Sequence, residues 1–149
     1  MSQQQAIDIN TIVAQAELLR ERLAALDLLI ADVQAAISNV EAALKTLSAI
    51  SSSDIVLAPG DAGFNTIFKA RVEDKEKVLY HIGGNIYAYL PRDKVEELLL
   101  RRLQTLGKTM NQLNKEKQVT ADQLAQLEYI INAALAAART QAGRQAPKT

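Results

Sequence analysis

The chain has 149 residues, of which 48% are hydrophobic but only 4% aromatic, so we expect a folded protein whose core is built from Leu, Ile, Val and Ala. Its 17 basic residues balance 17 acidic ones, which gives no net attraction to nucleic acid or to an anionic membrane. There is no cysteine for a disulfide or zinc site, no signal-like start and no run of about 18 apolar residues, so we expect a soluble, cytoplasmic protein.

Residues 6–50 are predicted to form one long helix of the coiled-coil type. Apolar residues recur there at alternating spacings of three and four, which is typical of a helix that keeps one narrow stripe against a partner helix. Ser48 and the run Ser51–Ser53 mark its end. The predicted stripe consists of Ile9, Ile12, Ala16, Leu19, Leu23, Leu26, Ile30, Val33, Ile37, Val40, Leu44 and Leu47.

Residues 54–90 change to a period of two and to β-forming residue types, which predicts two short β-hairpins. In the first, Ile55–Ala58 pairs with Phe64–Val72 across a turn rich in Gly and Pro. In the second, a strand returns through the turn Gly83–Asn85 to Ile86–Leu90.

Hairpins of this size cannot bury enough apolar area to be stable alone, and their open edges invite pairing with further strands. We therefore predict that the β segments of several subunits join into a shared barrel. The side chains predicted to be buried in this assembly are Phe64, Phe68, Val78, Tyr80, Ile82 and Ile86.

Residues 93–140 are predicted to form a second long helix, followed by a disordered tail over 141–149. Pro91 precedes the helix, and Asp93 with Glu96 three residues later resembles a capping box. The heptad pattern returns in Leu99, Leu103, Leu106, Met110, Leu113, Lys117, Thr120, Leu124, Leu127, Ile131, Ala134 and Ala138.

Two polar residues, Lys117 and Thr120, interrupt this second stripe. They could form a flex point or a register device, to which Gly107 could contribute. We favour the simpler alternative, in which the stem of Lys117 packs in the seam and its ammonium group reaches Asp27 or Asp32.

The two stripes match in length, so the simplest pairing of the helices is antiparallel and within one chain. We predict a mainly α protein with a small β region, forming a single domain over residues 1–149. Helices of roughly 45 residues would extend about 65 Å from the β region.

This arrangement resembles the alpha subunit of the archaeal prefoldin family. The second hairpin, VLYHIGGNIY at residues 78–87, carries much of the resemblance. Residues 63–64 and 68–70 resemble the family's second strand, and residues 74–78 resemble its charged turn. Two hairpins are typical of the alpha type, whereas the beta type has one. The resemblance covers roughly Ile7 to Ala138.

The resemblance implies an ATP-independent chaperone without enzymatic activity or cofactor. The expected complex contains two alpha and four beta subunits, whose hairpins build a double β-barrel body with coiled coils extending from it. Unfolded polypeptides are expected to bind near the coiled-coil tips and to pass to a group II chaperonin. The alternative is a structural coiled-coil protein that forms homomeric rings or filaments through its β segment.

Near both termini the apolar residues exceed what a two-residue stripe needs. Such surplus apolar side chains suit weak contact with an unfolded chain, although a widened seam or self-association would also explain them. The predicted client-binding residues are the surplus Ile7, Val13, Ile130 and Leu135 together with the stripe residues Ile9, Ile12 and Ile131.

Catalytic and metal-binding residues are not predicted. His81 is the only histidine, and the sequence shows no cysteine and no Ser or carboxylate arrangement beside it that would make it a catalytic base. Gly83-Gly84 lacks the spacing of a phosphate-binding loop and is followed by a strand, which favours a hairpin turn.

Overall fold

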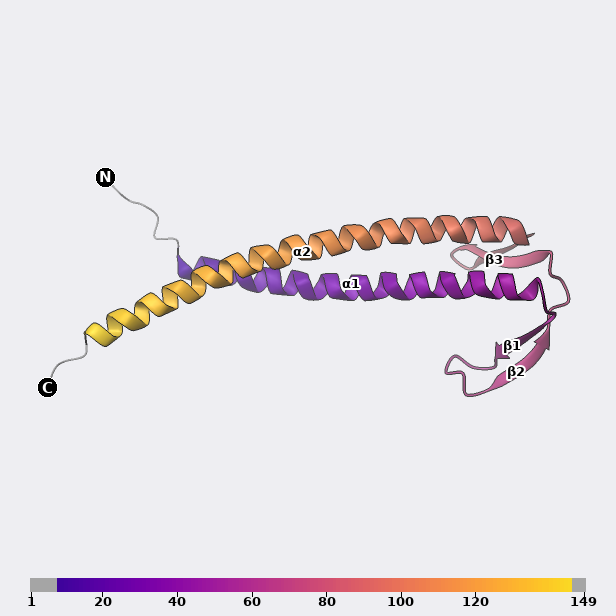
Figure 1. Cartoon of the computed structure of the whole chain (residues 1–149), viewed down its shortest axis with the longest axis horizontal. Coiled ribbons are helices and arrows are strands. Elements are labelled where there is room, and N and C mark those ends of the chain that lie inside the picture. The colour runs from indigo at the N-terminus through magenta and orange to yellow at the C-terminus, as the bar shows by residue number, and fades with distance from the viewer. Residues whose placement is uncertain (1–7, 146–149) are drawn as a thin grey trace. The chain divides into compact units, whose positions relative to one another are not determined.

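The structure, a computed structural model, describes residues 8–145 and contains two long antiparallel helices joined by two β-hairpins (Figure 1). The helices are α1 (Ile9–Ile50) and α2 (Arg92–Arg144). The predicted fold class, mainly α with a small β region, is confirmed. The strands are β1 (Ile55–Pro59), β2 (Ile67–Arg71), β3 (Lys77–Gly83) and β4 (Ile86–Pro91).

The chain divides into two compact units, whereas the sequence was interpreted as one domain. Unit 1 comprises Met1–Asp32 and Met110–Thr149, and unit 2 comprises Val33–Thr109. Each unit contains a stretch of α1 and a stretch of α2, and unit 2 also contains both hairpins. Each unit therefore has its own helix–helix interface.

Unit 2 is centred on a buried cluster formed by the end of α1 and the start of α2. Val40, Leu47 and Ile50 from α1 pack with Val95 and Leu99 from α2. Burial of a side chain of this size is worth about 1.5–3 kcal/mol, so the cluster holds the two helices together. The hairpin region adds partly buried residues to it, namely Val56, Val78, Tyr80 and Leu90 from the strands and Val72 just after β2.

Helix α1 ends at Ile50 because the residues that follow satisfy its last carbonyl groups with their side chains. The Ser51 hydroxyl donates to the Ser48 carbonyl oxygen at 2.5 Å, and the Ser52 hydroxyl donates to the Ala49 carbonyl oxygen at 3.1 Å. Serine side chains compete in this way with continuation of the helix.

Helix α2 begins directly after β4, at Arg92. The Arg92 N–H donates to the Glu76 carbonyl oxygen at 2.7 Å, which ties the start of α2 to the second hairpin. Asp93, which resembled a cap residue in the sequence, lies inside the first turn instead. A carboxylate in this turn still interacts favourably with the helix dipole.

The hairpins form two separate two-stranded antiparallel sheets, β1–β2 and β3–β4. Residues directly opposite one another share a face, so Val56 and Ala70 lie on one face of the first hairpin and Leu57 and Lys69 lie on the other. Strand β2 begins only at Ile67, three residues later than predicted, because the residues before it form a structured loop.

Unit 1 contains the other half of the predicted seam. Ile12, Ala16 and Leu26 of α1 are buried, and Thr120 of α2 is only 3% exposed. The Thr120 hydroxyl donates to the Glu116 carbonyl oxygen at 2.8 Å, so this buried polar side chain is satisfied within its own helix.

Three ion pairs connect the two helices of unit 1. Lys117 Nζ lies 2.6 Å from Asp27 Oδ1, so the predicted contact between this seam lysine and an acidic residue of α1 is present. The pairs are Arg20 with Glu128, Arg22 with Glu116, and Lys117 with Asp27. The first and last of these pairs run in the antiparallel sense, because Arg20 precedes Asp27 on α1 while its partner Glu128 follows Lys117 on α2.

The last part of α2 differs from the sequence-based expectation. Ala134 and Ala138, predicted at the seam, are exposed because the described part of α1 begins at Ile9 and α2 continues past it (Figure 1). Residues 141–144, predicted as a disordered tail, belong to the helix. The predicted helix residues before Asp8 lie outside the described residues.

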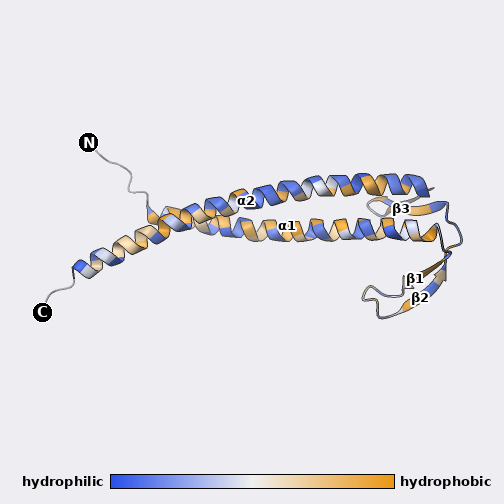
Figure 2. Cartoon of the chain, viewed as in Figure 1, coloured by the Kyte–Doolittle hydropathy of each residue, from blue (hydrophilic) through white to orange (hydrophobic). Residues whose placement is uncertain are grey.

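Helix α1 is long and apolar enough, by length and composition alone, to cross a membrane. The core helix of a soluble protein satisfies the same criteria. In α1 the apolar residues are interspersed with polar ones along the helix (Figure 2), and Val40 and Leu47 are buried against α2. Helix pairing therefore buries part of the apolar surface of α1.

Candidate interaction surfaces

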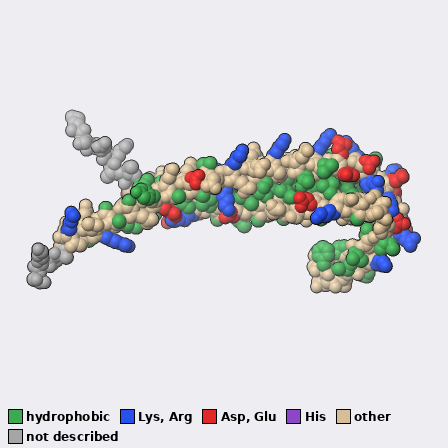
Figure 3. Space-filling model, in the orientation of Figure 1, with side chains coloured by type: hydrophobic (Ala, Val, Ile, Leu, Met, Phe, Trp, Pro, Cys, Tyr) green, Lys and Arg blue, Asp and Glu red, His purple; other side chains and the backbone are tan. Residues whose placement is uncertain are grey.

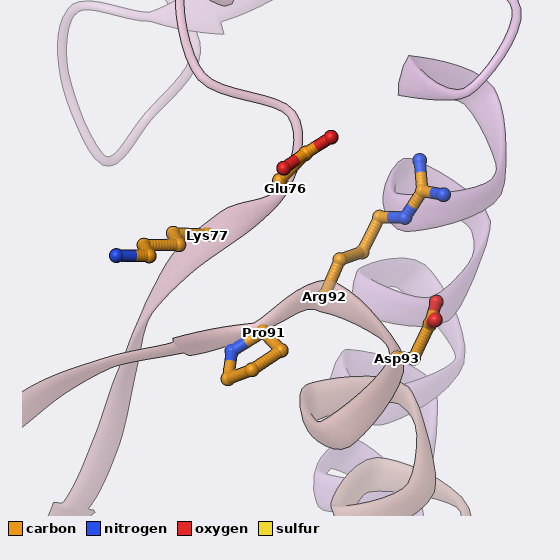
Figure 4. A pocket seen from close by; sticks show the side chains of 5 residues that line it. All are labelled: Glu76, Lys77, Pro91, Arg92 and Asp93. Atoms are coloured by element: carbon orange, nitrogen blue, oxygen red, sulfur yellow. The ribbon is translucent and has the colours of Figure 1, made fainter.

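The hollow shown in Figure 4 lies where β4 passes into α2. It is lined by Glu76, Lys77, Pro91, Arg92 and Asp93, and the side chain of Lys77 extends to the opposite side from that of Arg92. Both charge signs are present, so the hollow selects neither an anion nor a cation. Across residues 8–145, no group of three or more His, Asp or Glu side chains could hold a metal ion.

Large apolar side chains remain exposed over both hairpins. Figure 3 shows them on the β1–β2 hairpin, at the lower right. The first hairpin exposes them on both faces, because Leu57 lies opposite Lys69 whereas Phe68 lies opposite Ala58 on the other face. Exposed apolar side chains in such number are unfavourable in water. We define the hairpin surface by these residues: Ile55, Leu57, Phe64, Ile67, Phe68, Leu79, Ile82, Ile86, Tyr87 and Tyr89.

Four of the six predicted assembly residues belong to the hairpin surface, and two do not. Phe64, Phe68, Ile82 and Ile86 are exposed and remain available to another chain. The remaining pair, predicted on the same intersubunit face, is partly buried against the buried cluster of its own helices: Val78 and Tyr80.

The sequence interpretation missed the opposite face of the second hairpin. Leu79 lies directly opposite Tyr89, and His81 lies opposite Tyr87, so these side chains share the face that points away from the core. The signal was present in the sequence, because both sets of alternate positions in 78–89 contain large apolar residues. Alternation identifies two faces but not which one the chain's own helices cover.

His81 has a local structural role. Its Nε2 atom donates to the Gly84 carbonyl oxygen at 2.6 Å, which closes the turn between β3 and β4. Its ring centroid lies 4.9 Å from that of Tyr87 across the hairpin. These contacts agree with the interpretation of His81 as a strand residue.

The loop between β1 and β2 is organised by the carboxylate of Asp61. Asp61 Oδ1 accepts hydrogen bonds from the Thr66 N–H and the Thr66 hydroxyl, both at 2.8 Å. Asp61 Oδ2 accepts from the Gly63 N–H at 3.0 Å, from the Asn65 N–H at 3.2 Å and from Asn65 Nδ2 at 2.9 Å. The Thr66 hydroxyl is the largest of the contacts that hold the pKa of Asp61 far below its ordinary value.

This loop holds two aromatic side chains. Phe64 has a φ of 56°, a left-handed backbone conformation that costs a non-glycine residue about 1–2 kcal/mol, and its side chain is 66% exposed. The ring of Phe68 lies against the backbone of Gly60, where an added Cβ would come within 2.5 Å of Phe68 Cε2. Glycine is therefore required at position 60 for this placement of the Phe68 ring.

In unit 1, the residues predicted to bind clients differ in their accessibility. Ile12 is buried in the helix pair, while Ile9, Val13 and Ile131 are partly buried. Ile130 and Leu135 are exposed, and Ile7 lies outside the described residues. Of the predicted client-binding residues that the structure describes, only Ile130 and Leu135 are therefore exposed while the helices stay paired.

Unit 1 also exposes apolar residues that the sequence interpretation missed. Tyr129 is 77% exposed and, with Ile130, lines a hollow on α2. Leu18 is 65% exposed and lines a second hollow between the two helices, together with Leu127. Tyr129 and Leu18 lie outside the heptad positions. A search of both helices for apolar residues outside these positions would therefore have found them.

Comparison with known proteins gives consistent matches. The family described as "Prefoldin subunit" matches residues 12–137. The chain is 34% identical over 146 residues to the prefoldin subunit alpha of Aeropyrum pernix, covering 95% of each chain. It is 27% identical to the prefoldin subunit alpha of Sulfurisphaera tokodaii, covering 89% of this chain and 87% of the relative. A solved filamentous PFD from Methanocaldococcus jannaschii is similar with a TM-score of 0.46 and 26% identity, over 84% of this chain and 96% of that one.

Proposed function

Because the chain belongs to the prefoldin family as an alpha-type subunit, we propose that it captures unfolded polypeptides without ATP and delivers them to a group II chaperonin. Prefoldin subunits are non-enzymatic chaperones that assemble into a prefoldin complex. The proposal adds the partners, which are four beta-type subunits and a second alpha subunit. It also adds a cytoplasmic location for the complex.

Client capture is supported by the exposure of Ile130 and Leu135 in a unit whose helices already pack against each other through other residues. The helices of unit 1 bury Ile12 and Ala16 between them, so Ile130 and Leu135 are not needed to hold the pair together. Exposed apolar side chains on a helix surface bind extended apolar segments weakly. Several such surfaces in one complex gain avidity without a tight individual site, and weak individual contacts permit release.

The hairpin surface supports assembly. The first hairpin exposes apolar side chains on both faces and leaves both strand edges unpaired within its own two-stranded sheet. A two-stranded sheet in this condition is marginal in water, and strands from neighbouring subunits would cover both its faces and its edges.

A first experiment tests client capture. The chain is assembled with a beta-type subunit, and suppression of aggregation of a denatured client is compared between the wild type and the double variant Ile130→Ser and Leu135→Ser. We expect the double variant to form the same complex but to protect the client several-fold less well, because apolar contact area is removed from the client-binding surface.

The matched control is the double variant Leu28→Ser and Leu29→Ser, which also replaces two exposed aliphatic residues in unit 1. We expect it to protect the client as well as the wild type. Equal loss in both variants would contradict a site around Ile130 and Leu135. Equal protection by all three proteins would place capture on other surfaces of the complex.

A second experiment tests the remaining parts of the proposal. Protection should persist in EDTA and without nucleotide, and a labelled client should move from the complex to a group II chaperonin under the same conditions. The mass of the assembly in solution distinguishes a defined hexamer with a beta-type partner from open-ended assembly of this chain alone. The latter result would favour the structural alternative.

A further inference from the structure

The β1–β2 loop has many hydrogen bonds for a loop at the surface. Five hydrogen bonds converge on the Asp61 carboxylate from residues 63–66, and the Gly60 N–H donates to the Thr66 carbonyl oxygen at 2.8 Å. The Phe64 N–H also donates to the Asp61 backbone carbonyl oxygen at 3.2 Å. The side chain and the backbone of one residue thus fix the whole turn.

We propose that Asp61 is a positioning residue for subunit assembly, which holds the β1–β2 loop so that Phe64 and Phe68 stand as preformed aromatic anchors for a neighbouring beta-type subunit. This inference rests on the proposed assembly through the hairpin surface. It adds that Phe64 and Phe68 are the anchors of that assembly and that Asp61 orients them.

The conformation of Phe64 supports this role. A left-handed backbone at a phenylalanine is unfavourable in isolation and persists only where surrounding contacts impose it. Here the contacts that impose it are the hydrogen bonds to Asp61 on both sides of Phe64, at Gly63 and Asn65. The result is a large aromatic side chain that projects from the loop instead of packing on its own hairpin, since it is 66% exposed.

Gly60 adds a second constraint on the same loop. Because a Cβ at this position would meet both the Phe68 ring and the Thr66 hydroxyl, the close approach of Phe68 to the backbone depends on glycine. Two aromatic side chains are therefore held by the same short turn. Rigid, exposed aromatic residues are the usual anchors of protein interfaces, because binding does not have to order them.

The rest of the first hairpin indicates the kind of partner that the loop contacts. The chain assembles into a prefoldin complex, and the loop is continuous with exposed apolar residues on both strands, such as Leu57 and Ile67. With its carboxylate hydrogen-bonded inside the loop, Asp61 presents no free acceptor that would oppose an apolar partner. A beta-type subunit with an apolar surface fits these features.

Asp74 offers an internal comparison. Its carboxylate also organises a turn, accepting hydrogen bonds from the Glu76 N–H at 2.9 Å and the Lys77 N–H at 3.1 Å. That turn holds no aromatic side chain. Loss of the carboxylate at Asp74 should therefore loosen a turn without disturbing an anchor.

The test measures the affinity of the full chain for a beta-type subunit in a double-mutant cycle. We expect Phe64→Asn, which tolerates the left-handed backbone but lacks the aromatic ring, to weaken association about thirtyfold. We expect Asp61→Ala to weaken it about tenfold in the wild-type background and to change it little in the Phe64→Asn background, because Asp61 acts through Phe64.

Three further variants complete the design. Asp61→Asn keeps one side-chain acceptor and should recover part of the affinity, while the matched control Asp74→Ala should bind as the wild type does. Gly60→Ala, whose added Cβ would meet both the Phe68 ring and the Thr66 hydroxyl that binds Asp61, should also weaken association. Far-ultraviolet circular dichroism should report the same helix content for all of these proteins.

The inference would be overturned by an additive cycle, by wild-type affinity of Asp61→Ala, or by equal losses in Asp61→Ala and Asp74→Ala. Failure of the wild-type chain to associate with any beta-type subunit would instead overturn the proposed assembly itself. If Asp61→Ala does not fold, the decision rests on whether Asp61→Asn and Phe64→Asn are coupled.

Discussion

In unit 1 the two helices bury their seam against each other, whereas the hairpins of unit 2 leave most of their large side chains exposed. Leu26 on α1 and Thr120 on α2 are buried in the helix pair, and three ion pairs cross between the helices. In the hairpins, Leu57, Phe68 and Tyr89 are all more than half exposed.

This difference shows that a single chain can bury its helix seam but cannot cover its hairpins on all sides. Two antiparallel helices cover each other along one stripe, so their pairing needs nothing beyond this chain. A two-stranded sheet has two faces and two edges, and the chain's own helices cover only one face of each hairpin, through residues such as Val56 and Val78. The apolar side chains that remain exposed on the hairpins are therefore where we propose that other subunits bind.

The largest expected effect comes from placing a charge on the hairpin surface. Phe68→Asp or Ile82→Asp should dissociate the complex, because burying an unpaired carboxylate at a subunit interface costs about 3–5 kcal/mol. Sedimentation of the variant mixed with a beta-type subunit measures this. Thr105→Asp adds the same charge to an exposed position of α2 and should leave the complex intact. A complete hexamer with either hairpin variant would contradict the assignment of that residue to the interface.

A second prediction concerns stability within the chain. Val95 is only 2% exposed in the buried cluster of unit 2, so Val95→Ala should lower the free energy of unfolding of the isolated chain by about 2 kcal/mol. Leu100, on the same helix but 46% exposed, provides the control, and Leu100→Ala should cost less than about 0.5 kcal/mol. Denaturant unfolding measures both values, and similar losses in the two variants would contradict this description of the cluster.

A third, smaller effect is expected from the ion pair between Lys117 and Asp27. The side chains are 45% and 57% exposed, so solvent screens their attraction. A double-mutant cycle with Lys117→Met and Asp27→Asn should give a coupling of about 0.2–1 kcal/mol, which decreases at high salt. A coupling that is large and independent of salt would indicate a buried pair instead.

The smallest effect concerns pH and the two turn carboxylates, Asp61 and Asp74. Backbone hydrogen bonds from Glu76 and Lys77 lower the pKa of Asp74, as the Thr66 hydroxyl and its neighbours lower that of Asp61. A carboxyl group whose pKa is lower when folded contributes stability above its unfolded pKa of about 3.8, and this is lost as the pH falls through the folded pKa. We therefore expect these two groups to add no pH dependence to stability between about pH 5 and 8.

Carbon-detected NMR titration of the Asp61 carboxyl group measures this effect directly. Thr66→Val removes the hydroxyl contact that lowers the pKa most and should raise the pKa of Asp61 towards its ordinary value. An unchanged pKa in this variant would show that the hydroxyl does not bind the carboxylate in solution.

The helices could be predicted from the sequence because one property, the heptad spacing, determines which residues meet. Every predicted stripe residue from Ile9 to Leu47 on α1 is buried or partly buried, and so is every one from Leu99 to Ile131 on α2. The prediction failed at Ala134 and Ala138 because spacing along one helix does not show where the partner helix begins.

The hairpin surface could be predicted only in part. Val78 and Leu79 are adjacent and both apolar, so alternation alone could not show that Val78 packs on the core while Leu79 is exposed. Phe64 was placed in a strand by its residue type, but the hydrogen bonds that Asp61 makes within the loop outweigh that preference. Packing against the chain's own helices decided the first case, and local hydrogen bonds within the loop decided the second.

The order of the two helices along the chain has a consequence for synthesis. Helix α1 is complete at Ile50, but its partner begins only at Arg92 and extends over 53 residues. At about 5–20 residues per second, translation of α2 alone takes about 3–10 s. During those seconds the nascent chain carries the stripe from Ile12 to Leu47 without the helix that later covers it, so the newly made protein itself exposes an apolar segment before it can fold.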